Sequence, residues 1–172
     1  MSRSIYVLDT SYLIEIFGCG RDSNKLASIE VRKKLKGSTD RGGLFFVPLP
    51  CLFELGNHIA DVKHDSEREK LVDLFISTVK QSLAKSSPWT ITPSDNPEKV
   101  LPALLDTYNP LAKKQGVGLV DSFTIEEAAR LKAKFSKTKL KVHIWTNDRN
   151  LKKLEPDKEV DSYLWTSNGT SL

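Results

Sequence analysis

The sequence predicts an α/β fold built on a mainly parallel sheet. Short apolar segments alternate along the chain with longer segments of helical periodicity, and this succession is typical of β-α-β units. The apolar segments do not alternate strictly between polar and apolar residues, as expected for strands that are buried on both faces of a sheet. The length of 172 residues suits one domain over residues 1–172.

The N-terminal residues contain the clearest strand and helix signals. SIYVLD, residues 4–9, is rich in β-branched and aromatic residues and predicts a buried strand. Tyr12–Phe17 predicts a short helix that ends at Gly18. Thr10 or Ser11 would cap the N-terminus of this helix.

The next segments continue the alternation. Ser23–Lys36 has helical spacing, with Ser23 as a possible N-cap and Gly37 just past its end. GGLFFVP, residues 42–48, predicts a second buried strand. Two more helices and a short edge strand are then expected over residues 49–63 (with Pro50 near the start), 66–86 and 89–92.

Prolines interrupt the segment that follows. Residues 96–116 contain Pro102 and Pro110, so we expect helix in pieces at best, because proline removes a backbone donor and clashes with the preceding turn. The expected order continues with a helix over residues 118–135 and a third clear strand over residues 141–148. It ends with a short helix over Arg149–Leu154 and a last strand over residues 160–165.

The composition is that of a globular protein in a reducing compartment. The chain is 39% hydrophobic and 28% charged, and no apolar stretch approaches the roughly 18 residues that span a bilayer. Asp9 interrupts the N-terminal apolar stretch, which argues against a secretory signal. Cys19 and Cys51 lie in apolar surroundings, so we expect buried thiols, no disulfide and a cytoplasmic protein.

Positive charge is concentrated near the C-terminus. Residues 130–153 contain nine lysines or arginines and one acid, Asp148, although the net charge of the whole chain is only +4. Such a segment suits contact with phosphates, but a solvated helix face would have the same composition. The candidate nucleic-acid contacts are Arg130, Lys132, Lys134, Arg149, Lys152 and Lys153.

Acidic residues occupy positions where a parallel sheet would bring them together. Asp9 and Asp148 each follow a predicted strand. Glu54 lies among apolar residues of a predicted helix, and Asp121 lies at the start of another. The carboxyl ends of parallel strands meet at one edge, where ligands collect. Four carboxylates there would repel one another without a divalent cation, and oxygen-only ligands suit Mg²⁺ or Mn²⁺ better than Zn²⁺.

Each acid also has a structural alternative. Asp9, Asp121 and Asp148 could simply cap the helices that follow them. Glu54 could accept a hydrogen bond from His58, one turn further along its helix. Otherwise a carboxylate between large apolar residues needs a cation, because unpaired burial costs several kcal/mol.

Four segments resemble, in order, the sequence blocks of PIN-domain nucleases: VLDTSYLIEIF, PLPCLFEL, GLVDSFTIEEAARL and IWTNDRNL. The chain looks closest to the VapC-type ribonuclease toxins of bacterial and archaeal toxin–antitoxin pairs, and the resemblance covers Val7 to Leu151. It departs from the family pattern in a longer, proline-punctuated stretch over Pro88–Pro110, and in Leu151 where an aromatic residue is common. These departures bear on substrate and partner more than on chemistry.

The resemblance implies a PIN-like three-layer α/β/α sandwich and a Mg²⁺- or Mn²⁺-dependent endoribonuclease. Its catalytic and metal-binding residues would be Asp9, Glu54, Asp121 and Asp148, supported by Ser11, Thr146 and Asn147. It further implies an RNA substrate, a cognate antitoxin protein and a homodimer. The lack of a long apolar stretch separately predicts no membrane association.

Other classes of function stay open from the sequence. A PIN-like module could bind RNA or protein without cutting, and a stand-alone nuclease could process RNA without an antitoxin. A phosphatase of the haloacid dehalogenase type would need a second acid two residues after Asp9, where Ser11 stands. A phosphoacceptor receiver domain would need neighbouring acids at the first strand and a lysine after a late strand.

Overall fold

The computed structural model of the protein describes residues 3–19, 25–93 and 96–159. A sheet of four strands lies at its centre, with the order β3-β2-β1-β4 and every neighbouring pair parallel. The strands are β1 (Ser4–Leu8), β2 (Leu44–Pro48), β3 (Thr90–Thr92) and β4 (Lys141–Trp145). The helices are α1 (Thr10–Phe17), α2 (Lys25–Asp40), α3 (Leu49–Ala60), α4 (Asp65–Lys85), α5 (Pro97–Gln115), α6 (Leu119–Lys134) and α7 (Arg149–Lys153).

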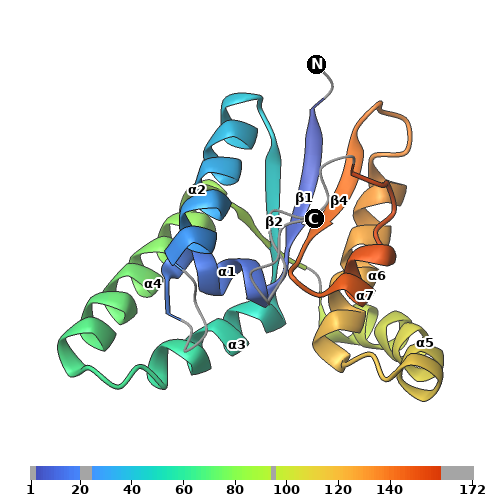
Figure 1. Ribbon diagram of the computed structural model, residues 1–172. Coiled ribbons are helices and arrows are strands. Elements are labelled where there is room, and N and C mark those ends of the chain that lie inside the picture. The colour runs from blue at the N-terminus through green and yellow to red at the C-terminus, as the bar shows by residue number, and fades with distance from the viewer. Residues whose placement is uncertain (1–2, 20–24, 94–95, 160–172) are drawn as a thin grey trace.

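Strand register brings the carboxyl ends of the strands to one edge of the sheet. Ile5 of β1 lies opposite Leu44 of β2 and Val142 of β4. Because every pair is parallel, all strands run in the same direction. In Figure 1 their carboxyl ends point down toward α3 and the start of α6. This lower edge is where the loops after β1 and β4 begin.

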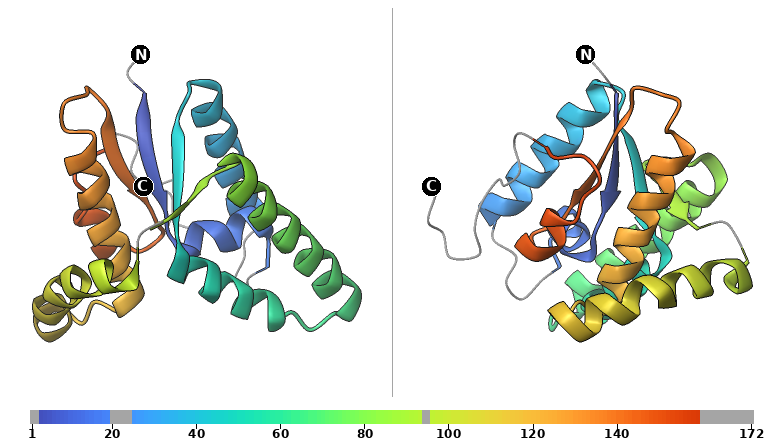
Figure 2. Two further views of the ribbon diagram at one scale, coloured as in Figure 1. Left: turned by 180° about the vertical axis from the view of Figure 1, so that it is seen from behind. Right: turned by 90° about the vertical axis from the view of Figure 1, so that its right-hand side faces the viewer.

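Alternate residues of the strands enter two separate cores. On one face Tyr6, Leu8 and Trp145 pack with residues of α1 and α3. On the other face Ile5, Val7 and Ile144 pack with α6. The right-hand view of Figure 2 shows α2 and α6 on opposite sides of the sheet. The predicted α/β fold with a parallel sheet is confirmed, and its layers are those of an α/β/α sandwich.

Most local predictions are confirmed. The four expected strands within the described residues are present, and β3 lies at the edge of the sheet. Gly18 ends α1 with a positive φ of 71°, which glycine adopts without a steric penalty. Cys19 and Cys51 are free and buried.

The ends of two helices bear on the predicted caps. The interpretation of Asp9 as a helix cap is confirmed, because Asp9 is the N-cap of α1 and its side chain accepts a hydrogen bond from the Ser11 N–H, whereas Thr10 and Ser11 are not the cap. Gly37 lies inside α2, which continues to Asp40. The end of α2 is set instead by backbone bonds from Gly42 to Thr39 and from Gly43 to Ser38.

The predicted interruption of the proline-rich segment is wrong, because α5 is a single helix that contains Pro102 and Pro110. Asn96 caps its start and Gly116 closes its end. The carbonyl groups that lose their donors to the two prolines are those of Glu98 and Asp106. Both residues are exposed, so water can replace the missing N–H groups.

Some predictions fall outside the described residues, namely Ser23 as an N-cap and the last strand over residues 160–165. Across the residues that are described, no helix combines the length and apolar character that a bilayer crossing requires.

Candidate metal centre

The four predicted acids line one open pocket at the carboxyl edge of the sheet. They come from the β1–α1 junction, from α3, from the first turn of α6 and from the start of α7. The lining residues are Asp9, Thr10, Ser11, Ile14, Glu54, Asn57, His58, Asp121 and Asp148. The side chains that the sequence analysis selected are therefore brought together by the fold.

Asp9 is the most buried acid of this pocket, with an exposed fraction of 6%. Its Oδ2 accepts hydrogen bonds from the hydroxyl groups of Ser11, at 2.8 Å, and Thr146, at 2.9 Å. Burial raises the pKa of the Asp9 carboxyl, and these hydrogen bonds offset only part of that rise. Because Asp9 also caps α1, its position is fixed by the backbone as well.

Ser11 and Thr146 connect the loops that follow β1 and β4. The Ser11 Oγ accepts a hydrogen bond from the Asn147 N–H at 2.9 Å. The Thr146 Oγ1 accepts one from the Asp148 N–H at 3.0 Å. The supporting residues predicted from the sequence thus form one network around Asp9, in which Asn147 takes part through its backbone.

Glu54 is half-buried on α3, as expected, but its partner differs from the predicted alternative. Its Oε2 accepts a hydrogen bond from the Thr10 hydroxyl at 2.6 Å. His58 is exposed and lines the same pocket without a hydrogen bond to Glu54 among the described contacts. Thr10 is a site residue that sequence reasoning missed, although its place beside Asp9 was a signal for it.

Asp121 lies in the first turn of α6, where Gly118 is the N-cap and has no side-chain cap bond. Asp121 is thus not the N-cap residue itself, but its carboxyl accepts a backbone hydrogen bond from Gly118, one of the N–H groups at the start of α6. Burial, followed by the charges of Asp9 and Asp148, raises the pKa of Asp121 to about 6. Burial is the largest cause of this shift, and the neighbouring negative charges add to it.

Asp148 does cap its helix. Its Oδ1 accepts hydrogen bonds from the backbone N–H groups of Asn150, at 2.6 Å, and Leu151, at 3.3 Å. The side chain is exposed and still lines the pocket, so capping and a role in the site are compatible.

The donor set of this pocket fits a hard divalent cation. All four candidate ligands are carboxylates, and Asp9 is held by hydroxyl groups in a fixed orientation. Elsewhere in the described part of the chain, His143, Glu155 and Glu159 form a more compact group, because their possible ligand atoms all lie within 4.8 Å of one another. The pocket acids are spaced more widely, so a cation would contact some of them directly and others through water.

The group of His143, Glu155 and Glu159 is already neutralised by the chain. The buried Lys152 ammonium donates to Glu155 at 2.7 Å and to Glu159 at 3.1 Å. Burial alone would raise the pKa of Glu155, but hydrogen bonds from His143 and Lys152 outweigh it and lower that pKa. We therefore assign this group to structural ion pairing.

The prediction that Lys152 contacts nucleic acid is wrong, because its ammonium is buried and paired with Glu155. Arg130 forms a bidentate pair with Glu127, and Lys132 pairs with Asp157 at 2.6 Å. Lys134, Arg149 and Lys153 are exposed.

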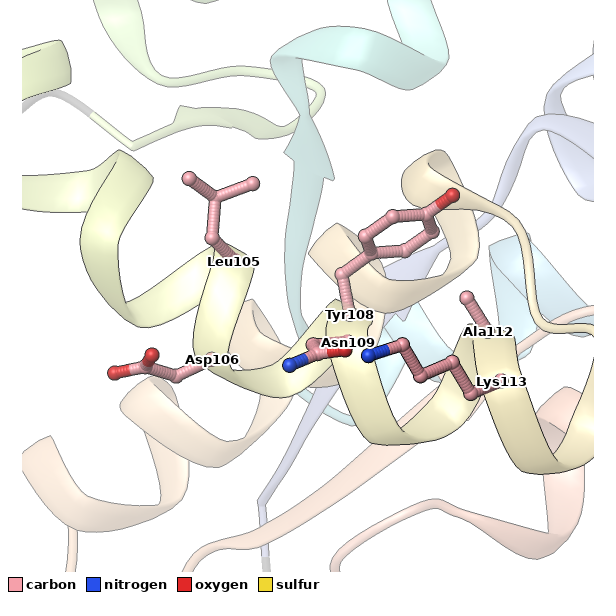
Figure 3. A pocket seen from close by; sticks show the side chains of 6 residues that line it. All are labelled: Leu105, Asp106, Tyr108, Asn109, Ala112 and Lys113. Atoms are coloured by element: carbon pink, nitrogen blue, oxygen red, sulfur yellow. The ribbon is translucent and has the colours of Figure 1, made fainter.

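A second hollow lies along α5 (Figure 3). Its lining consists of α5 residues: Leu105, Asp106, Tyr108, Asn109, Ala112 and Lys113. It contains none of the predicted site residues and brings together no groups from different elements, so we assign it no function.

No protein-family model matches this chain, and no curated protein matches it. The interpretation of the pocket therefore depends on its geometry and chemistry.

Proposed function

We propose that the protein is an endoribonuclease that hydrolyses RNA phosphodiester bonds with the help of Mg²⁺ or Mn²⁺. The observation that supports this proposal best is the convergence of Asp9, Glu54, Asp121 and Asp148 in one pocket at the carboxyl edge of a parallel sheet. A hard cation would offset the mutual repulsion of these carboxylates. The charges of Asp9 and Asp148 contribute, after burial, to the raised pKa of Asp121.

Each residue of the pocket has a role in this proposal. Asp9 and Asp121 would hold the cation, with Glu54 and Asp148 contributing directly or through water. When bound, the cation would lower the pKa of a water molecule and neutralise charge that develops on the phosphate. Ser11 and Thr146 orient Asp9, and Thr10 orients Glu54.

The resemblance to VapC-type toxins extends the proposal to the biological setting. The protein would be the toxin of a toxin–antitoxin pair, would form a homodimer and would be inhibited by a small antitoxin protein. Growth arrest on expression, relieved by Asp9→Asn, is the expected result. Normal growth with an active nuclease would instead indicate a stand-alone RNA-processing enzyme.

The test of the activity is cleavage of RNA by the purified protein with Mg²⁺ or Mn²⁺. We expect Asp9→Asn and Asp121→Asn each to lower the rate by at least about 100-fold, because metal ligands matter more than the outer groups that support them. Asp106→Asn is the matched control, since Asp106 is exposed on α5 and lies outside the pocket. Undiminished cleavage by the pocket variants would refute the metal mechanism.

A further inference from the structure

The basic segment near the C-terminus contains two kinds of cation. Arg130, Lys132 and Lys152 are held in ion pairs. Arg149 and Lys153 of this segment, and Lys158 shortly after it, are exposed and have no ion pair within the described residues. The uniform basic run of the sequence is thus divided into structural charges and charges that are open to a ligand.

The backbone after α7 determines where the exposed cations lie. The Ile144 N–H donates to the Glu155 carboxylate at 3.2 Å, and the Asp157 N–H donates to the Val142 carbonyl at 3.1 Å. Residues 155–157 therefore run back along the free edge of β4, antiparallel to it. Asp157 thereby lies opposite Val142, one residue from Lys141 at the start of that strand, and Lys158 follows it.

The exposed cations consequently follow one another along this edge. Arg149 comes directly after Asp148 of the pocket, and Lys153 ends α7. Lys141 begins β4, and Lys158 directly follows Asp157, which is paired with Val142 of that strand. We propose that these four residues, the β4-edge track, bind the phosphate backbone of RNA and lead it into the acidic pocket. This inference rests on the proposed nuclease function.

The charge balance of this edge favours a polyanion. The three acids of residues 155–159 are neutralised by Lys132, Lys152 and Lys34, so they do not cancel the track. Lys137 and Lys139 extend the exposed positive charge past the start of β4. Because the pocket itself is negative, a substrate phosphate needs such a positive approach to reach it.

The length of the track matches several phosphates. From Lys141 to Trp145, β4 rises by about 13 Å at roughly 3.3 Å per residue. A positive track of this length can contact more than one phosphate of the same strand. Contacts with phosphates alone carry no base information, so we expect binding that is insensitive to sequence and weakens with salt.

The experiment measures binding separately from cleavage. In the full-length Asp121→Asn protein, anisotropy of a fluorescein-labelled single-stranded RNA is followed over a range of KCl concentrations. Lys153→Glu with Lys158→Glu is expected to weaken binding about tenfold and to reduce the slope of log K against log[salt] by about 1.4, since each phosphate contact on a single strand contributes about 0.7.

Lys70→Glu with Lys80→Glu is the matched control. Both lysines are exposed on α4, on the opposite flank of the molecule in Figure 1, and the pair changes the net charge equally. An equal loss of RNA affinity in the two double variants would refute the proposed binding to the track. An unchanged slope of log K against log[salt] in the track variant would refute it as well. Competition by polyglutamate as effective as by unlabelled RNA would also refute it, in favour of an acidic polypeptide.

The two proposals can fail separately. A wild-type protein that binds RNA through the track but does not cut it would refute the nuclease and leave the track intact. A wild-type protein that cuts RNA, with full binding and cleavage retained after Lys153→Glu and Lys158→Glu, would refute the track alone.

Discussion

Three hydroxyl groups hold the carboxylates of the pocket in place. Ser11 and Thr146 donate to Asp9, and Thr10 donates to Glu54. Thr146 is almost completely buried, and its oxygen also accepts the Asp148 N–H. One side chain thus connects two of the four acids, and its loss would disturb both.

Thr146→Val tests whether the hydrogen bonds of the Thr146 hydroxyl, rather than the packing of this side chain, stabilise the protein. The substitution leaves the Asp148 N–H without its Thr146 acceptor and removes one of the hydrogen bonds to the buried Asp9 carboxylate, which keeps those from Ser11. We therefore expect a loss of about 2 kcal/mol in the free energy of unfolding. Thr146→Ser keeps the hydroxyl and should cost about 1 kcal/mol or less. Urea denaturation measures both values, and equal losses would contradict the role of the hydroxyl.

The pH dependence of the metal-free protein tests the charge crowding at Asp121. The folded state holds this proton more tightly than the unfolded state, with a pKa of about 6 against the ordinary value of 3.8. Stability therefore falls as pH rises from about 4 through about 6, and stays lower above that range.

Asp121→Asn should remove this loss and stabilise the metal-free protein at pH 7 by about 1 kcal/mol, a figure reduced for the partial exposure of the side chain. Thermal melting at several pH values in the presence of a chelator measures the effect. An Asp121→Asn protein with the same pH profile as the wild type would show that the acids do not repel one another.

At the scale of elements, α7 and the segment after it are fastened to β4 by buried charge. Lys152 donates to the Ile144 carbonyl at 2.9 Å as well as to Glu155 and Glu159. Glu159 also accepts from the Trp145 indole N–H at 3.2 Å. The cluster covers the free edge of β4, which would otherwise expose unpaired backbone groups.

Lys152→Ala and Lys153→Ala form a matched pair for this element. Removing the Lys152 ammonium leaves Glu155 and Glu159 buried without it, so we expect a loss of about 3 kcal/mol in stability. Lys153 is exposed, and its replacement should change stability by less than about 0.5 kcal/mol. Similar small effects in both variants would argue against a structural role for Lys152.

At the scale of the whole molecule, the parallel sheet joins distant parts of the chain into one pocket. The hydrogen bond between Thr146 and Asp9 connects residues 137 positions apart, and that between Thr10 and Glu54 connects residues 44 apart. A cation bound in the pocket would therefore tie β1, α3, α6 and α7 together.

Mg²⁺ or Mn²⁺ should for this reason raise the melting temperature. A ligand at about 100 times its Kd stabilises a folded protein by about 2.7 kcal/mol. Differential scanning fluorimetry with and without the metal measures the shift. We expect Asp9→Asn to lose most of it and Asp106→Asn to keep it, and a shift of equal size in both variants would place the cation elsewhere.

The sequence by itself determined the elements and the acids, because strand composition, helix periodicity and terminal residues are local properties of the chain. It identified the strands within the described residues, and it selected Asp9, Glu54, Asp121 and Asp148. It failed at α5, which contains Pro102 and Pro110, because proline disfavours a helix without excluding it and the carbonyls that lose their donors there belong to exposed residues. Only the tertiary structure decided that Thr10 is the partner of Glu54, and that Lys152 is buried while Lys153 is exposed. The reason is that partners and burial depend on which distant segments the sheet brings side by side, and neighbouring residues of one helix can face opposite environments.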